Sequence, residues 1–156
     1  MKNQITPCLW FDNQAEEAAN FYTTIFKNSK IESISRYTKE GFDIHGMPEG
    51  TVLTVEFSLN GQEFTALNGG PLFKFNESIS FQVFCETQEE IDYYWYKFVA
   101  EGEEGQCGWL KDKYGVSWQI VPAILPELLK NPEKAEKVTA VFMQMKKFEI
   151  SELLNA

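Results

Sequence analysis

The chain has 156 residues, of which 44% are hydrophobic and 24% charged, a length and composition typical of one folded domain with an ordinary core. Its formal net charge of −9 would be repelled by a nucleic-acid backbone or an anionic bilayer, so the composition argues against both as partners. The sequence has no apolar stretch of the length that a signal peptide or membrane span needs, and its three cysteines lack ligand-like spacing, so we expect a cytoplasmic protein with reduced thiols.

The first third of the chain predicts a strand, a helix and a second strand. Residues 5–11 are rich in apolar and β-branched side chains, as in a strand. Asn13 and Glu16 have the spacing of a capping box, and the apolar residues that follow recur at helical spacing. Residues 31–38 predict the second strand.

A loop and a hairpin complete this first unit. Residues 39–50 hold three glycines and the chain's single histidine, His45, and predict a long loop. Residues 51–59 alternate between apolar and polar side chains, as a half-buried strand does. Asn60-Gly61 is a strong two-residue hairpin signal, which makes residues 62–68 the returning strand.

The same order of elements then repeats. Residues 78–86 predict a strand, and Thr87 with Glu90 forms a capping box before an amphipathic helix. Further strands are expected over residues 106–111 and 115–121, with no strand signal just before them, so the second unit looks one strand short. The apolar stripes of the two helices superimpose at a constant offset, which indicates a supersecondary duplication.

The residues after Pro122 predict a short helix, followed by a longer one that Asn131-Pro132 begins. In the longer helix Val141 and Met143 lie off the main apolar stripe. A helix with a second apolar stripe needs a second surface to cover it, and a two-fold partner supplies one. We therefore expect a homodimer whose interface includes the C-terminal segment.

Several runs are distinctive, above all ALNGGP at residues 66–71 and YGVSWQIVP at residues 114–122. With Pro7–Tyr22 and Met143–Lys147, they resemble the PhnB-like branch of the vicinal oxygen chelate superfamily, which also holds glyoxalase I, extradiol dioxygenases and bleomycin-resistance proteins. The resemblance implies an α+β fold in which two βαβββ modules form a curled, cup-like mixed sheet, with C-terminal helices added.

This resemblance sets the expected boundaries and the expected site. We expect a single domain, with module one at about residues 1–72, module two at about 76–122 and a helical tail at 123–156. Metal enzymes of the superfamily carry His and Glu ligands on the inner strands of the cup. The positions that the resemblance assigns to ligands here hold neutral side chains: Thr6, Asn68, Ser78 and Gln119. Hydroxyl and amide oxygens are weak ligands for a divalent transition ion, so we expect neither a metal nor another cofactor.

Strand alternation adds neighbours to these positions, since residues two apart share a face. The candidate ligand-binding residues are Thr6, Cys8, Trp10, Asn68, Ser78, Ser80, Gln82 and Gln119. For Asn68 and Gln119 an equal alternative is that their amides only satisfy backbone groups at strand ends.

Two further residues are candidates for catalysis. Glu56 is either a solvated residue of an antiparallel pair or a general base in the cup. Cys8 is a candidate nucleophile, but a weak one, because it has no cationic neighbour in sequence that would lower the pKa of its thiol. His45 is interpreted as a solvated loop residue, with a mobile lid residue as the alternative.

Three classes of function remain open. A metal-free module that binds a small aromatic or amphipathic molecule, as bleomycin-resistance proteins do, is favoured by the uncharged polar and aromatic candidates. The alternatives are an enzyme of glyoxalase, dioxygenase, lyase or isomerase type with an atypical site, and a structural or regulatory dimer without ligand. Members of the branch often carry the label demethylubiquinone methyltransferase. The sequence lacks a glycine-rich strand-to-helix turn for a nucleotide-like methyl donor, so we do not expect that activity.

Overall fold

The computed structural model describes residues 5–156, and the chain divides into two compact units, residues 1–74 and 75–156. Each unit holds a four-stranded mixed sheet, with strand orders β1-β4-β3-β2 and β5-β8-β7-β6. The two orders are equivalent, which confirms the duplication. Two such sheets with covering helices are the expected α+β fold. The assignment of both units to one domain stays a prediction.

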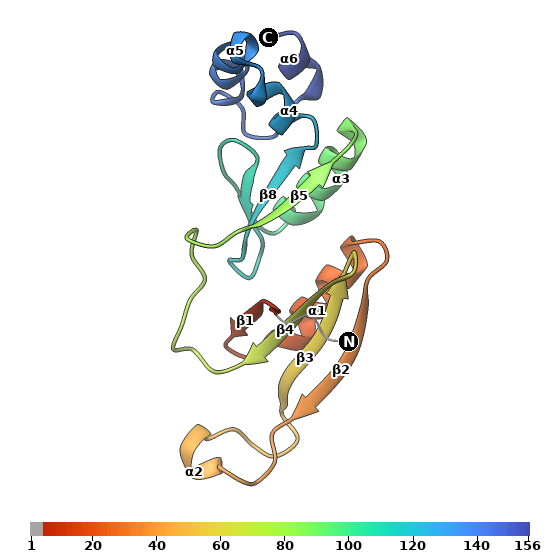
Figure 1. Cartoon of the computed structure of the whole chain (residues 1–156). Helices are drawn as coiled ribbons and strands as arrows, with labels where there is room; N and C mark the ends of the chain where they lie inside the picture. The colour runs from red at the N-terminus through yellow and green to blue at the C-terminus, as the bar shows by residue number, and fades with distance from the viewer. Residues whose placement is uncertain (1–4) are drawn as a thin grey trace. The chain divides into compact units, whose positions relative to one another are not determined.

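The first sheet consists of β1 (Cys8–Phe11), β4 (Gln62–Asn68), β3 (Val52–Leu59) and β2 (Lys30–Arg36), and α1 (Ala15–Ile25) covers one of its faces (Figure 1). β1 runs parallel to β4, and the other pairs are antiparallel.

The buried stripe of α1 has the helical spacing that the sequence predicts, and Tyr22 from this stripe stacks on Phe57 of β3 with ring centroids 6.2 Å apart. The hairpin between β3 and β4 is also confirmed, because Asn60 and Gly61 both have positive φ, at 48° and 84°.

Three expectations for this unit need correction. The predicted Asn13–Glu16 capping box is wrong, because α1 begins after Gln14, whose side chain makes no capping hydrogen bond. The first strand is shorter than residues 5–11, since ladder pairing with β4 begins at Cys8. The loop over residues 39–50 contains a one-turn helix, α2 (Phe42–His45).

In the second unit, β5 (Phe81–Cys85), β8 (Ser117–Pro122), β7 (Trp109–Lys111) and β6 (Glu103–Glu104) form the sheet, and α3 (Gln88–Val99) packs on one face. Two side chains show this packing, since Phe98 of α3 stacks on Trp118 of β8 at 4.7 Å. The second unit is therefore not a strand short. The missing strand is β6, and two residues are too few to show periodicity in sequence.

The capping signals in this unit are confirmed. The Thr87 hydroxyl accepts a hydrogen bond from the Glu90 backbone N–H at 3.2 Å, and the Glu90 carboxylate accepts one from the Glu86 N–H at 2.8 Å. Asn131 caps α5 (Pro132–Phe142) in the same way, because its Oδ1 accepts from the Glu133 N–H at 3.0 Å.

The C-terminal segment belongs to the same compact unit as the second sheet. It comprises α4 (Leu125–Lys130), α5 and α6 (Ile150–Leu154). Its buried apolar residues are Leu125, Val138, Met145, Phe148 and Leu153. Much of the apolar content of the tail is thus covered within its own unit. None of the helices in residues 5–156 has the length and hydropathy that crossing a membrane requires.

Candidate functional site

Each sheet has one face covered by its long helix and an opposite face, here called the open face. On the second sheet the register places Gln82 beside Gln119 and Gln119 beside Trp109, so these side chains share the open face. Phe84 and Val121, two residues further along β5 and β8, lie on the same face. The residues between them, such as Trp118 and Ile120, are buried on the other face.

Three neutral polar side chains meet on this open face, as the sequence predicts for Ser80, Gln82 and Gln119. Gln119 Nε2 donates to Ser80 Oγ at 2.8 Å, and Gln82 Nε2 lies 3.4 Å from Gln119 Oε1. We call these three residues the amide network. A primary amide has two N–H groups and two lone pairs, so each glutamine keeps hydrogen-bonding capacity for a ligand.

The two glutamines of the amide network lie at the polar edge of a pocket of about 420 Å³. Gln82 and Gln119 line it, together with apolar side chains from the sheet and the tail and one cysteine: Phe84, Trp109, Val121, Leu125, Pro126, Leu129, Phe142, Phe148 and Cys107. None of these residues is charged. A volume of this size and a largely apolar lining with a few polar groups are typical of small-molecule sites.

The open face of the first sheet has a different character. It holds a pocket of about 340 Å³ that Thr6, Glu56 and Thr65 line with two further carboxylates, Glu32 and Glu63. The Ser33 hydroxyl donates to Glu56 Oε2 at 3.0 Å. Glu56 therefore points to the open face, as the general-base alternative requires, in a surrounding rich in negative charge.

Asn68 lies on the opposite face of this sheet, toward α1, and only 3% of it is exposed. Its Oδ1 accepts from the Ala15 N–H at 2.8 Å, and its Nδ2 donates to the Val52 carbonyl at 3.0 Å. The amide thus satisfies backbone groups, and in β4 the open face is formed instead by residues such as Thr65 and Leu67, paired with Cys8 and Trp10.

Cys8 and Trp10 lie on the open face of the first sheet. Trp10 Nε1 donates to the Gly70 carbonyl at 2.8 Å, and its ring meets Phe73 edge-on at 5.0 Å. Cys8 is exposed, yet partial burial of its thiol raises its pKa. A raised pKa reduces the thiolate fraction, which weakens the nucleophile interpretation of Cys8.

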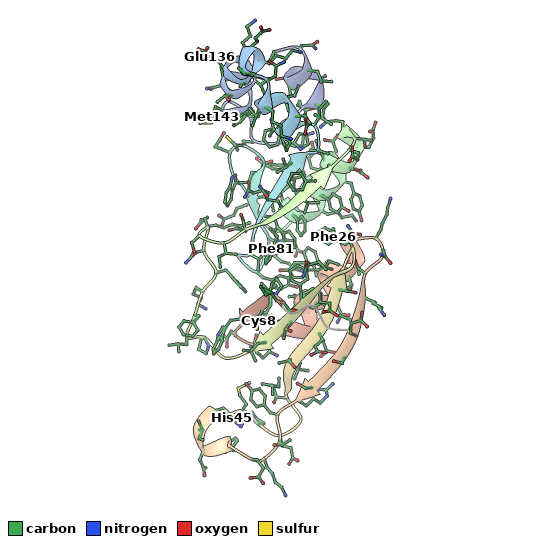
Figure 2. The ribbon with its side chains drawn as sticks, in the orientation of Figure 1. Cys8, Phe26, His45, Phe81, Glu136 and Met143 are labelled. Carbon is green, nitrogen blue, oxygen red and sulfur yellow. The ribbon has the colours of Figure 1, made fainter. Side chains whose placement is uncertain are left out.

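Two predicted positions lie outside the sheets. Ser78 precedes β5, and its N–H donates to Asn76 Oδ1 at 2.9 Å within a turn. His45 sits in the loop that carries α2 (Figure 2), where its Nδ1 accepts from the Met47 N–H at 3.0 Å and its ring lies 4.6 Å from Tyr37.

The donor set does not fit the divalent ion of the superfamily's metal enzymes. Thr6, Asn68, Ser78 and Gln119 offer only neutral oxygens, and Asn68 faces α1. Within residues 5–156 no three His, Cys, Asp or Glu side chains are grouped so that they could hold a metal ion.

The tail residues of the pocket were not among the predicted site residues. Leu125, Leu129, Phe142 and Phe148 appear in the sequence only as a surplus of apolar side chains after the last strand. That surplus is the available signal, and from sequence alone it predicts a subunit interface.

The repeated strand order and the open face of each sheet define a member of the glyoxalase or vicinal oxygen chelate superfamily. Residues 3–121 match the model of the 3-demethylubiquinone-9 3-methyltransferase family, so the chain belongs to that family. No curated protein matches the chain.

Solved structures agree with this assignment. A putative 3-demethylubiquinone-9 3-methyltransferase, PhnB protein, from Bacillus cereus is 43% identical and covers 78% of this chain and 100% of its own, with a TM-score of 0.69. The genomically encoded fosfomycin resistance protein FosX from Listeria monocytogenes shares the fold at 19% identity and a TM-score of 0.53, covering 84% of this chain and 99% of its own. Protein PA1353 from Pseudomonas aeruginosa also shares the fold, at 15% identity and a TM-score of 0.60, and covers 78% of this chain and 98% of its own.

Proposed function

We propose that this protein binds a small uncharged molecule on the open face of its second sheet, without a metal ion. The observation that carries the proposal is the amide network at the edge of the 420 Å³ pocket. Apolar walls supply the free energy of burial, and a few polar groups fix the orientation of the ligand.

The neutral character of this pocket selects the charge of the ligand. Burying an ion without a partner costs far more than burying a hydrogen-bonded neutral group, and no lining residue offers an opposite charge. A ligand that donates to or accepts from Gln82 and Gln119 keeps its polar group satisfied.

The family name describes methyl transfer, but the chain's own residues give that activity no support. The turn from β1 to α1 is Asp12-Asn13-Gln14, and the turn from β5 to α3 is Glu86-Thr87. Neither turn contains the glycines that let the backbone of a strand-to-helix turn lie close to a nucleotide-like methyl donor. We therefore propose binding rather than methyl transfer.

The test is a thermal-shift screen of small molecules in buffer with EDTA, on wild-type protein and on Gln119→Leu. We expect compounds that raise the Tm of the wild type and bind Gln119→Leu at least about tenfold more weakly, since loss of one or two hydrogen bonds costs about 1.4 kcal/mol or more. Gln144→Leu is the matched control, because Gln144 is exposed and does not line the pocket.

Two results would oppose the proposal. Equal affinity of wild type and Gln119→Leu for every compound would place binding away from the amide network. Elemental analysis that finds about one transition ion per chain in purified protein would contradict metal independence.

An acid–base enzyme, such as a lyase or isomerase, is the second candidate. Glu56 favours it, because this carboxylate lies in the 340 Å³ pocket of the first sheet with Thr6 and Thr65. In that case Glu56→Gln would abolish turnover of a compound that the wild type converts, while affinity for the compound stays the same.

A further inference from the structure

The tail supplies five of the residues that line the pocket on the second sheet. The family match ends at residue 121, and five of the lining residues lie beyond it: Leu125, Pro126, Leu129, Phe142 and Phe148. The amide network and the sheet residues belong to the matched part. The five apolar tail residues, here called the tail wall, are therefore a feature of this chain's C-terminal segment.

Backbone hydrogen bonds fasten the tail to the sheet next to Phe148. The N–H groups of Cys107 and Gly108 donate to the carbonyls of Met145 and Lys146, both at 2.7 Å. Gly108 has φ +79°, and a Cβ at this position would lie 2.4 Å from Cε2 of Phe148. Only glycine fits both requirements, so the turn before β7 is shaped for the ring of Phe148.

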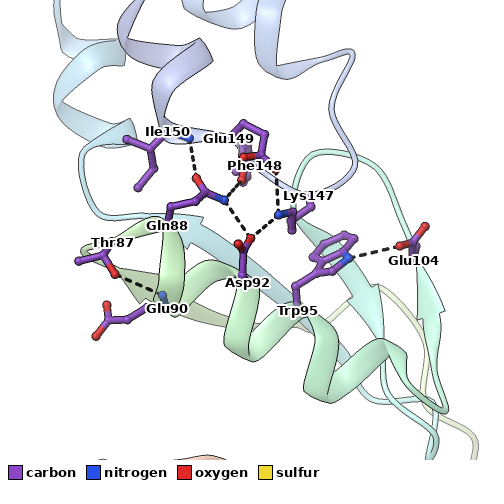
Figure 3. Close-up of polar contacts among 10 residues, drawn as sticks. All are labelled: Thr87, Gln88, Glu90, Asp92, Trp95, Glu104, Lys147, Phe148, Glu149 and Ile150. Atoms are coloured by element: carbon purple, nitrogen blue, oxygen red, sulfur yellow. Dashed lines mark hydrogen bonds and ion pairs between the residues drawn. The ribbon is translucent and has the colours of Figure 1, made fainter.

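Side chains of helix α3 also bind this segment (Figure 3). Gln88 Nε2 donates to the Phe148 carbonyl at 3.0 Å, and Gln88 Oε1 accepts from the Ile150 N–H at 2.9 Å. Lys147 forms ion pairs with Asp92 and Glu149. Phe148 is 2% exposed, with its ring centroid 6.1 Å from that of Phe142, so this wall is preformed.

The aromatic residues of the pocket indicate the class of ligand that it binds. Phe84, Trp109, Phe142 and Phe148 line it, and aromatic rings pack best on other rings. Phe84 lies in β5, the edge strand of this sheet, and is 54% exposed where it lines the pocket, so its ring is available to a ligand.

We infer that the C-terminal segment makes this pocket a site for an uncharged aromatic molecule that carries one N–H, O–H or carbonyl group. The ring system lies against the tail wall and Phe84, and the polar group meets Gln82 or Gln119. This inference rests on the proposed function and adds the class of ligand and the role of the tail.

The test uses two probes with the same ring system. N-phenyl-1-naphthylamine is neutral and has one N–H, whereas 8-anilino-1-naphthalenesulfonate adds a sulfonate. Fluorescence titration of the full chain in EDTA should show saturable binding of the neutral probe. The sulfonate probe should bind at least about tenfold more weakly, because no lining residue neutralises its charge.

Variants assign the binding to the tail wall. Leu129→Gln places a polar group in the wall, and it should weaken binding of the neutral probe at least about tenfold. Leu129 is 37% exposed, so the fold should tolerate the change. If circular dichroism shows that Leu129→Gln is unfolded, Leu129→Ala is used in its place. Leu154→Gln is the matched control, because Leu154 is 49% exposed in α6 and does not line the pocket.

The outcomes separate this inference from the proposed function. Unchanged affinity in Leu129→Gln, with loss in Gln119→Leu, would overturn the role of the tail and leave the proposed function standing. Loss in Leu129→Gln with unchanged affinity in Gln119→Leu would overturn the amide network. Tighter binding of the sulfonate probe, or no binding of the neutral probe by the wild type, would overturn the ligand class. A further result would also overturn the ligand class. If the wild type is a dimer that does not bind the probe, and Leu129→Gln is a monomer, then a second copy of the chain fills the pocket.

Discussion

Asn68 shows how one side chain can connect three elements of the first unit. It ends β4, caps the first turn of α1 through the Ala15 N–H and holds the Val52 carbonyl at the start of β3. The resemblance assigned this position to a ligand. The sequence already contained the contrary signal, because Asn68 shares its strand face with Phe64 and Ala66, which are buried.

Asn68→Ala should therefore destabilise the protein by about 2 kcal/mol, from loss of a cap and from buried backbone groups left without partners. Urea unfolding measures this. The control is Asn20→Ala on the exposed side of α1, which should change stability by no more than about 0.5 kcal/mol. Equal stability of Asn68→Ala and wild type would show that the buried amide has no structural role.

At the scale of elements, capping motifs and the hairpin were predictable because they depend on neighbours in sequence. Thr87, Asn131 and Asn60-Gly61 act as expected. The cap of α1 and strand β6 were not predictable, because the cap comes from Asn68 and β6 exists through pairing with β7. The attachment of the tail to α3 depends in the same way on residues far apart in sequence.

The tail attachment predicts a dependence of stability on pH. The hydrogen bond from Lys147, with a further one from Gln88, lowers the pKa of Asp92 against the opposing effect of burial. A carboxylate with a lowered pKa in the folded state stabilises the fold above its ordinary pKa of about 4, and this contribution is lost as the pH falls through the folded-state value.

Asp92→Asn should accordingly be about 0.5 kcal/mol less stable than wild type at pH 7, a small effect because 40% of the Asp92 side chain is exposed and solvent screens the pair. Below about pH 4 the difference should shrink toward zero. Urea unfolding at pH 7 and pH 3 measures both values, and Asp43→Asn in α2 is the control. A difference that grows as the pH falls would contradict this account of Lys147 and Asp92.

On the scale of the whole molecule, the sequence predicts the duplicated order of elements because each copy follows the same pattern of apolar stripes and caps. It did not predict that the tail would form a pocket wall, since burial of Leu125 and Phe148 depends on where the tail packs. The tail still exposes apolar side chains, among them Ile124 at 38% and Met143 at 56%. Because this apolar surface is exposed in the single chain, we still propose a homodimer in which a second copy covers it.

Light scattering at micromolar concentration should give twice the chain mass of 18.0 kDa. The double variant Ile124→Gln and Met143→Gln should shift the mass toward one chain, because it makes the exposed apolar surface polar. A wild-type mass of 18.0 kDa would contradict the homodimer and would show that the tail packs only within its own subunit.

Binding of a neutral molecule by the amide network of the second sheet, without metal, can be observed at the glutamine side chains themselves. The most direct measurement is an ¹H–¹⁵N correlation spectrum of the side-chain amides in EDTA during titration with N-phenyl-1-naphthylamine, with the Gln119 signals identified by their loss in Gln119→Leu. We predict saturable shifts of the Gln119 and Gln82 side-chain signals as the probe binds. Binding that leaves both pairs of signals unmoved, or shifts that arise only after a divalent metal is added, would contradict the claim.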